Sequence, residues 1–100
     1  MAYRLKILPI VHKDIQEGIS WYNSRQTGLG KRFHEAVKAE YNILKRHPHF
    51  QIRYDGVRCL PMKTFPYMIH YIVEEEKKRV VVLGVINTYK DPDKWMDRAK

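Results

Sequence analysis

Hydrophobic and polar positions change their period several times along the chain, and each change predicts an element. Residues 3–8 alternate roughly as a strand does, and Pro9 ends that run. From Val11 the apolar positions recur every three or four residues, as on one stripe of a helix. That stripe consists of Val11, Ile15, Ile19 and Tyr22. A glycine-rich breaker at 28–30 follows, so we expect the helix to end around 23–26.

A second helix is predicted over 29–45, with Thr27 as a candidate cap. Its apolar face consists of Leu29, Phe33, Val37, Tyr41 and Leu44, widened by Ala36. Pro48 closes the helix, because a proline disfavours helical geometry at the residue before it. The loop between the two helices is short, so we expect an antiparallel hairpin.

After Pro48 the pattern turns to strands. Asp55-Gly56 is a turn signal, and residues 57–63 can form a strand in which Pro61 indicates an edge or a bulge. A second strand is predicted over 67–73. Residues 74–78 form a polar turn.

The last predicted strand covers residues 79–86. It is apolar on both faces, so it should be a central strand that is covered on both sides. Pro92 then begins a short terminal helix that includes Trp95.

This order of elements predicts a single domain over residues 1–100 with an α+β fold. An N-terminal strand precedes an antiparallel two-helix hairpin. The hairpin packs on a mainly antiparallel sheet of three to four strands, and a short C-terminal helix follows.

The charge balance points to a partner. The net charge is +8 and the sequence pI is about 9.7. Lys and Arg outnumber Asp and Glu by 9 to 4 in residues 1–50 and by 10 to 7 in the second half. The excess therefore belongs to the folded surface, which favours RNA, DNA or an acidic protein as partner over a role in solubility alone.

The single cysteine, Cys59, excludes an intrachain disulfide and fits a reducing cytosol. We expect it to be a small buried hydrophobe in a strand. No stretch is apolar enough to span a membrane, and Arg4 and Lys6 interrupt the only apolar run near the N-terminus. We therefore expect a cytoplasmic protein.

Motifs for a cofactor or a metal are not found, and we predict neither; His47 and His49 are expected to be solvated. Cationic and aromatic residues near the sheet are the remaining candidates for a target or nucleic-acid surface. They are Arg58, Lys63, Tyr89, Lys90, Lys94, Trp95 and Arg98. Phosphate attracts cations, and single-stranded bases stack on aromatic faces.

Cleavage of RNA through its 2′-hydroxyl needs a base, an acid and positive charge on the phosphate, which Lys, Arg and Tyr can supply. The simpler interpretation is structural. Tyr67, Tyr71 and Trp95 are expected to complete the core, and His70 is expected on a semi-exposed sheet face rather than in catalysis.

The chain resembles the RelE/ParE superfamily of bacterial toxins over nearly its whole length. The resemblance is carried, in order, by Asp14-Ile15, Trp21-Tyr22, Gly28-Leu29-Gly30, Arg32-Phe33, Val37, His47-Pro48, Val57-Arg58, Phe65-Pro66-Tyr67, Ile69, Tyr71, the 80–85 strand, Asp91-Pro92, Trp95 and Arg98. No single element is specific, but the ordered set is. The Gly-Leu-Gly loop and the Phe-Pro-Tyr strand look more like the ParE or plasmid-stabilisation side.

The resemblance implies a toxin of a type II toxin–antitoxin module, which inhibits growth until a cognate antitoxin binds it directly in a hetero-oligomer. RelE-like members cleave messenger RNA on the ribosome, and ParE-like members act on DNA gyrase. The RNA-cleaving branch typically has an arginine directly after the tyrosine of the second meander strand, where this chain has Met68. Many members carry a histidine and arginines after the last strand, where this chain has Asn87-Thr88-Tyr89-Lys90.

An arginine that stabilises the charge of the phosphate contributes about 3 kcal/mol to transition-state stabilisation, so its loss makes a ribonuclease less favoured. Three hypotheses follow. The first is a non-catalytic toxin directed at gyrase. The second is a ribosome-dependent endoribonuclease that uses Arg58, Lys63, Tyr89 and Lys90. The third is an inactive or purely regulatory partner of the antitoxin.

Overall fold

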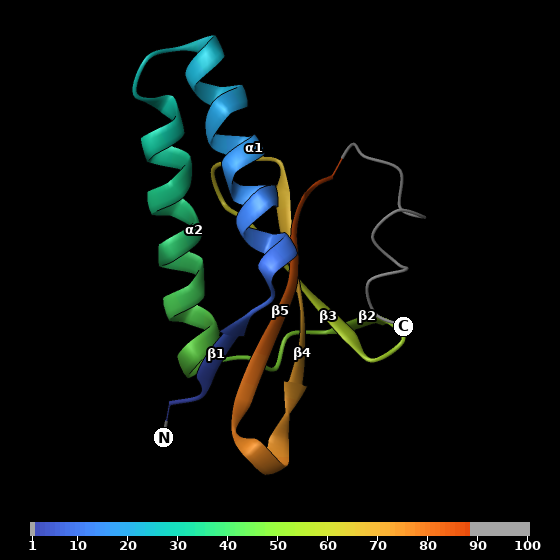
Figure 1. Cartoon of the computed structure of the whole chain (residues 1–100). Coiled ribbons are helices and arrows are strands. Elements are labelled where there is room, and N and C mark those ends of the chain that lie inside the picture. The colour runs from blue at the N-terminus through green and yellow to red at the C-terminus, as the bar shows by residue number, and fades with distance from the viewer. Residues whose placement is uncertain (1, 89–100) are drawn as a thin grey trace.

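The computed structural model describes residues 2–88 and has two layers, a helical hairpin and a sheet (Figure 1). Strand β1 (Arg4–Ile7) leads into helix α1 (Pro9–Arg25), and helix α2 (Leu29–Arg46) returns antiparallel to it. The remaining strands are β2 (Ile52–Tyr54), β3 (Val57–Pro61), β4 (Tyr67–Glu74) and β5 (Arg79–Asn87). A short 3₁₀ turn, Glu75–Lys77, connects β4 to β5. The predicted C-terminal helix lies outside the described residues.

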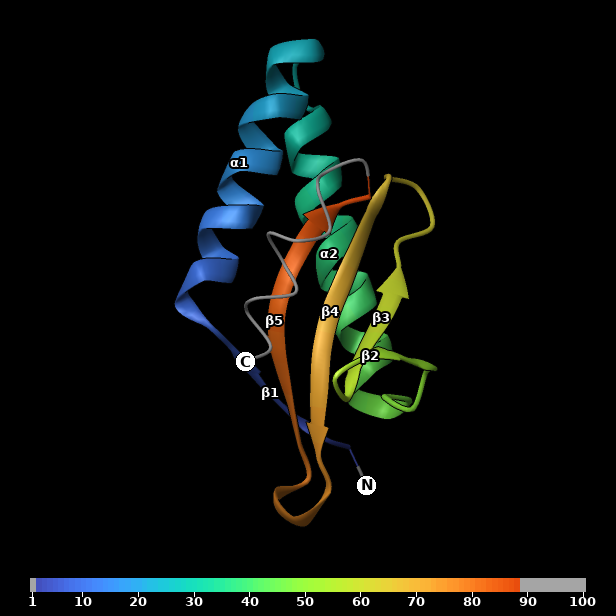
Figure 2. The ribbon, with the colours of Figure 1, turned by 90° about the vertical axis from the view of Figure 1, so that its right-hand side faces the viewer.

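The sheet has five strands in the order β1-β5-β4-β3-β2, with β5 and β4 side by side at its centre (Figure 2). The prediction of three to four strands is therefore wrong by the short strand β2, whose three residues are too few and too exposed to show alternation. The β1–β5 pair is parallel and the other three pairs are antiparallel. The α1–α2 hairpin and strands β2, β3 and β4 all lie between β1 and β5 in the chain, which gives the long connection that a parallel pair requires.

Local chemistry explains most boundaries. Pro9 ends the strand as expected, but it also begins α1 two residues earlier than the apolar stripe indicates, since a proline fits the first helical turn. Gly28, with φ +87°, precedes α2 in place of the predicted Thr27 cap. Pro61 is the last residue of β3, and β2 pairs only with Val57 and Arg58. No β2 partner therefore needs the backbone amide that proline lacks.

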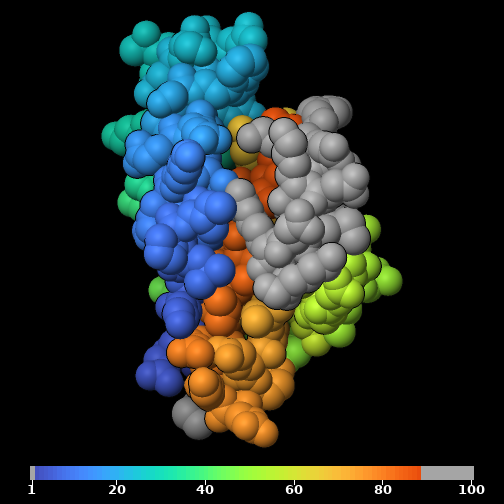
Figure 3. Space-filling view, turned by 45° about the vertical axis from the view of Figure 1, so that its right-hand side comes forward, coloured from blue at the N-terminus to red at the C-terminus, as the bar shows by residue number. Residues whose placement is uncertain are grey.

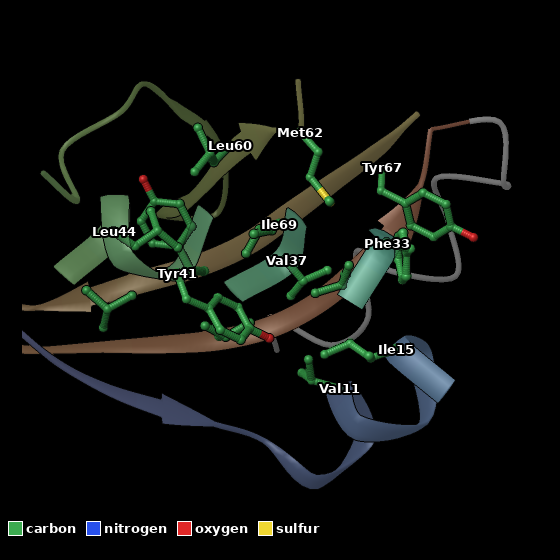
Figure 4. Close-up of a cluster of buried hydrophobic side chains, with 14 residues drawn as sticks. Val11, Ile15, Phe33, Val37, Tyr41, Leu44, Leu60, Met62, Tyr67 and Ile69 are labelled. Atoms are coloured by element: carbon green, nitrogen blue, oxygen red, sulfur yellow. The ribbon is translucent and has the colours of Figure 1, made fainter. Parts of the chain in front are cut away.

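The hydrophobic core lies between the helices and one face of the sheet, with the predicted stripes of both helices in it (Figure 4). Val11 and Ile15 of α1 and Phe33, Val37, Tyr41 and Leu44 of α2 meet Leu60, Met62, Tyr67, Ile69, Tyr71, Val80, Val82 and Val85. The prediction that Tyr67 and Tyr71 belong to the core is confirmed.

The two helices approach closely at two glycines. A Cβ on Gly18 would lie 2.5 Å from the Phe33 ring, and one on Gly30 would lie 2.5 Å from the Ile19 carbonyl oxygen. The Gly30 amide also donates to Asn23 Oδ1 at 2.9 Å. The Gly-Leu-Gly loop therefore combines a turn glycine, Gly28, with a glycine that allows backbone contact between the helices.

Strand β5 is buried from Val80 to Ile86, which confirms the prediction of a central strand. Its pairing with β4 shifts between His70 and Tyr71, so that Leu83 is an extra residue in β5. As a result Val82 and Val85 both join the helix-side core, while Val81 and Leu83 pack with Val57 in a second cluster on the opposite face.

Candidate functional surfaces

The face of the sheet opposite the α1–α2 hairpin holds a polar cluster of Tyr54, Cys59 and His70. Cys59 on β3 lies opposite His70 on β4. His70 Nδ1 is 3.0 Å from the Tyr54 hydroxyl and 3.3 Å from Cys59 Sγ. His70 is only 2% exposed, so the expectation of a semi-exposed histidine is wrong. Alternation correctly excludes His70 from the helix-side core, but this second face is buried as well.

Cys59 is buried, as predicted. Burial raises the pKa of its thiol, and the charge of Arg53 opposes that shift only in part. The thiol is therefore protonated near neutral pH, and a protonated thiol is a poor nucleophile. We infer that the cluster orders the sheet and does not present reactive groups to a substrate.

Arg58 lies on β3 opposite Tyr71 and ties the sheet to the segment between α2 and β2. Its Nη1 donates to the Phe50 carbonyl oxygen at 2.5 Å, and the Tyr71 hydroxyl donates to the Pro48 carbonyl oxygen at 2.6 Å. Burial raises the pKa of Tyr71 to about 12, so that hydroxyl keeps its proton. Both side chains are thus engaged with the backbone of the fold.

Lys63 is exposed and lies past the end of β3, at another level of the sheet from Arg58. Arg58 and Pro61 alone are three residues apart on the strand, which corresponds to roughly 10 Å, and Lys63 follows further on. At this same end Thr88 donates to the Pro66 carbonyl oxygen through its amide at 2.9 Å and its hydroxyl at 3.2 Å. Lys63 and the exit of β5 therefore share one end of the sheet, away from Arg58.

The other candidate residues lie outside the described part of the chain. They are Tyr89, Lys90, Lys94, Trp95 and Arg98. The assignment of all these residues to a target surface stays a prediction.

A groove runs between β1 and the C-terminal half of α2, with a volume of about 750 Å³. Figure 1 shows that end of α2 beside β1. The groove is lined by Tyr3, Arg4, Leu5, Ile7, Lys38, Tyr41, Asn42 and Lys45. Tyr41 is 9% exposed, and its hydroxyl has no hydrogen-bond partner among the residues described. No signal in the sequence predicts this groove, because it depends on which strand β1 pairs with.

Asp14 is a second residue that the site prediction missed. Its Oδ2 accepts a hydrogen bond from the Val85 amide at 3.1 Å, beyond the point where β1 stops pairing with β5. The carboxylate thus satisfies an amide at the uncovered edge of β5 and fixes α1 to the sheet. In the view of Figure 3, α1 (blue) and the β2–β3 hairpin (yellow-green) lie on opposite sides of the molecule.

Within residues 2–88, no helix is both long and apolar enough to cross a membrane. The same residues contain no group of three or more His, Cys, Asp or Glu side chains placed to hold a metal ion.

Comparison with known proteins finds the same fold in toxin–antitoxin structures. A chromosomal ParDE TA system from P. aeruginosa matches with a TM-score of 0.76 and 14% identity, over 86% of this chain and 96% of that one. Free E. coli toxin RelE, with two arginines changed to alanine, matches with a TM-score of 0.73 and 19% identity, over 99% and 95% of the two chains. The RelBE2 toxin–antitoxin complex from Mycobacterium tuberculosis gives 0.61 and 16%, over 87% and 99%.

No protein-family model matches the sequence, and no curated protein does. The protein has the RelE/ParE fold, as the resemblance predicts. At these identities the likeness concerns the fold, and it does not separate the ParE branch from the RelE branch.

Proposed function

We propose that this protein is the toxin of a type II toxin–antitoxin module, which an antitoxin neutralises by direct binding. The observation that carries the proposal is the agreement of fold with ParDE, RelE and RelBE2 over 86–99% of the chain. The net charge of +8 supports an acidic partner. We place its action in the cytoplasm.

Within this role we propose a non-catalytic toxin with DNA gyrase as target. Three features of the sheet support it over RNA cleavage. Met68 stands where the RNA-cleaving branch typically has an arginine, and Arg58 is engaged with the Phe50 carbonyl. His70, the imidazole of β4, is buried against Cys59 and Tyr54 and so lacks access to a phosphate.

A ribosome-dependent endoribonuclease is the second candidate. The position of Lys63 favours it. Lys63 lies at the end of the sheet where β5 ends, and in the sequence Tyr89 and Lys90 come directly after Thr88.

Expression of the chain alone in bacteria tests these alternatives. The gyrase hypothesis predicts growth arrest, disturbed DNA supercoiling and intact messenger RNA. It also predicts that Lys90→Ala and Tyr89→Phe leave toxicity largely intact, whereas surface changes around Trp95 abolish it. The ribonuclease hypothesis predicts cut messenger RNA and the reverse effect of these variants. Normal growth would leave only an inactive or regulatory partner of an antitoxin.

A further inference from the structure

Helix α2 is packed unequally along its length. In its first half, residues 29–37, the Gly30 amide donates to Asn23 Oδ1 of α1 at 2.9 Å, and the glycine allows the two backbones to touch. The Phe33 side chain in the same half is fully buried. We call residues 29–37 the anchored half of α2 and residues 38–46 its distal half.

The distal half is held less closely. Leu44 is fully buried and anchors it to the core, and the Tyr3 amide donates to the Lys45 carbonyl oxygen at 2.8 Å. Open space flanks this half on the side of β1, because the groove of about 750 Å³ runs beside it (Figure 1). Its residues that line the groove are Lys38, Tyr41, Asn42 and Lys45.

Glu40 interrupts the apolar face of the distal half. Val37, Glu40 and Leu44 follow one another at spacings of three and four residues, so they lie on one stripe of the helix, and Glu40 is only 5% exposed. Its Oε2 is buried and has no hydrogen-bond partner within residues 2–88. A carboxylate oxygen taken out of water without a hydrogen bond destabilises the packed form of the helix.

The next residue adds a second group of the same kind. The hydroxyl oxygen of Tyr41 is buried, and it too lacks a hydrogen-bond partner in the described part of the chain. Among the residues that the structure describes, Glu40 and Tyr41 hold the buried side-chain oxygens that have no partner. The cost in free energy is therefore concentrated in one helical segment, and that segment recovers it when water reaches both groups.

We propose that the distal half of α2 opens locally from the sheet while the remainder of the fold stays intact, and that the buried carboxylate of Glu40 sets the population of the open form. Opening hydrates Glu40 and Tyr41 and costs the burial of Leu44. The anchored half stays in place because its contacts with α1 are close and hydrogen-bonded. This inference concerns the folded chain alone and does not depend on the proposed toxin role.

Local opening makes part of the apolar core conditionally accessible. Leu44 belongs to the same buried cluster as Leu60, Ile69 and Tyr71, so these side chains lose part of their cover when the distal half leaves the sheet (Figure 4). A molecule that binds the open or the packed form more tightly then shifts the balance between the two. The segment is thus a conformational device built into the hairpin.

Hydrogen exchange of the whole chain, followed by NMR for each amide, is the direct test. Amides 41–44 should exchange about tenfold or more faster than amides 33–36, and dilute urea should change their rates little, because local opening exposes little surface. Amides 20–23 lie at the same distance from the end of α1 and control for fraying. Equal rates in the two halves of α2, or equally fast exchange of amides 20–23, would overturn the proposal.

Glu40→Leu tests the role of the carboxylate. It should slow exchange of amides 41–44 about tenfold, by the same factor as the unfolding equilibrium constant falls, because residue 40 is hydrated in both the open and the unfolded forms. Glu35→Leu makes the same change on the exposed face of α2 and should alter neither quantity.

Glu40→Gln guards against a poor fit of leucine, since it keeps the shape of the side chain and removes its charge. It should slow exchange of amides 41–44 in the same direction by a smaller factor, about threefold. Unchanged or faster exchange in both Glu40 variants would overturn the proposal. Equal slowing by Glu35→Leu would overturn it as well, because burial of the carboxylate would then have no special effect.

Discussion

The sheet face opposite the α1–α2 hairpin and the β1–α2 groove differ in how their polar groups are hydrogen-bonded. On that face, His70 Nδ1 contacts the Tyr54 hydroxyl and Cys59 Sγ, and both His70 and Cys59 are buried. Beside the groove, the Tyr41 hydroxyl is buried and has no hydrogen-bond partner within residues 2–88. Buried polar groups that are hydrogen-bonded to one another stabilise a fold, whereas a buried hydroxyl without a hydrogen-bond partner costs free energy.

This contrast changes where function is sought on this sheet. The sequence directs attention to cations and aromatics near β3 and β4, where Arg58 and Tyr71 are bonded to the backbone. The groove instead lies at the far edge, on the only parallel strand pair of the described sheet. The following predictions are ordered from the largest expected effect to the smallest.

Removal of His70 should cause the largest loss of stability. His70→Ala leaves a cavity and withdraws a partner from Tyr54 and Cys59, so the free energy of unfolding should fall by about 2–4 kcal/mol. Urea denaturation measures it, with the exposed His12→Ala as control, expected within about 0.5 kcal/mol of wild type. If the two variants were equally stable, the cluster would not be structural and the contrast with the groove would disappear.

Gly18→Ala tests the helix hairpin that forms one wall of the groove. Its new methyl would meet the buried Phe33 ring, so we expect a net loss of about 1–2 kcal/mol, although alanine itself favours helix by about 1 kcal/mol. Thermal unfolding measures the change. Ser20→Ala on the same helix is the control, and it should be neutral or slightly stabilising. A stabilised Gly18→Ala would show that the hairpin is looser than the structure indicates.

Asp14 should contribute to stability through its hydrogen bond to the Val85 amide. Asp14→Ala removes the acceptor of the Val85 amide, and because this bond is only partly buried the loss should be about 0.5–1.5 kcal/mol. Asp14→Asn keeps an oxygen acceptor and should retain most of that stability. Chemical denaturation of both variants provides the comparison, and equal losses would mean that the charge of Asp14, not its hydrogen bond, is what counts.

Glu75 should give the smallest effect, visible in its pH dependence. Its hydrogen bonds to His49 and Tyr3 lower the pKa of its carboxyl from its usual value in the folded protein. The resulting stability is present above the unfolded pKa and is lost as pH falls through the folded one. Wild type and Glu75→Gln should therefore differ at neutral pH and converge in acid, as followed by melting temperature. Parallel curves would argue against the pairing, and the exposed Glu76→Gln is the control.

Much of the fold was predictable because local patterns carry it. The apolar stripes of Val11 and Ile15 and of Phe33 and Val37 identify both helices and their buried faces, and the apolar run from Val80 identifies the central strand. Strand β2 was missed because its three exposed residues have no alternation. The sequence also could not show which β5 side chains face the helices, because the extra residue Leu83 changes the alternation of the valines.

The candidate site was less predictable. Arg58 and Lys63 are visible in the sequence as cations. That Lys63 lies past the end of β3, and that Arg58 donates to the Phe50 carbonyl oxygen, is known only from the structure. His70 was placed on the correct face and given the wrong exposure. Tyr41 was predicted as a core residue, and nothing in its spacing shows that its hydroxyl has no hydrogen-bond partner among residues 2–88.

The sequence by itself determined the class of fold, the order of the elements, the two helix stripes and the strong positive charge, because each depends on residues close together in the chain. Only the tertiary structure decided that β1 joins β5 in parallel, that His70 is buried, and that β1 and α2 enclose a groove. These features depend on which distant segments pair, since the burial of a side chain and the satisfaction of its polar atoms are properties of that pairing.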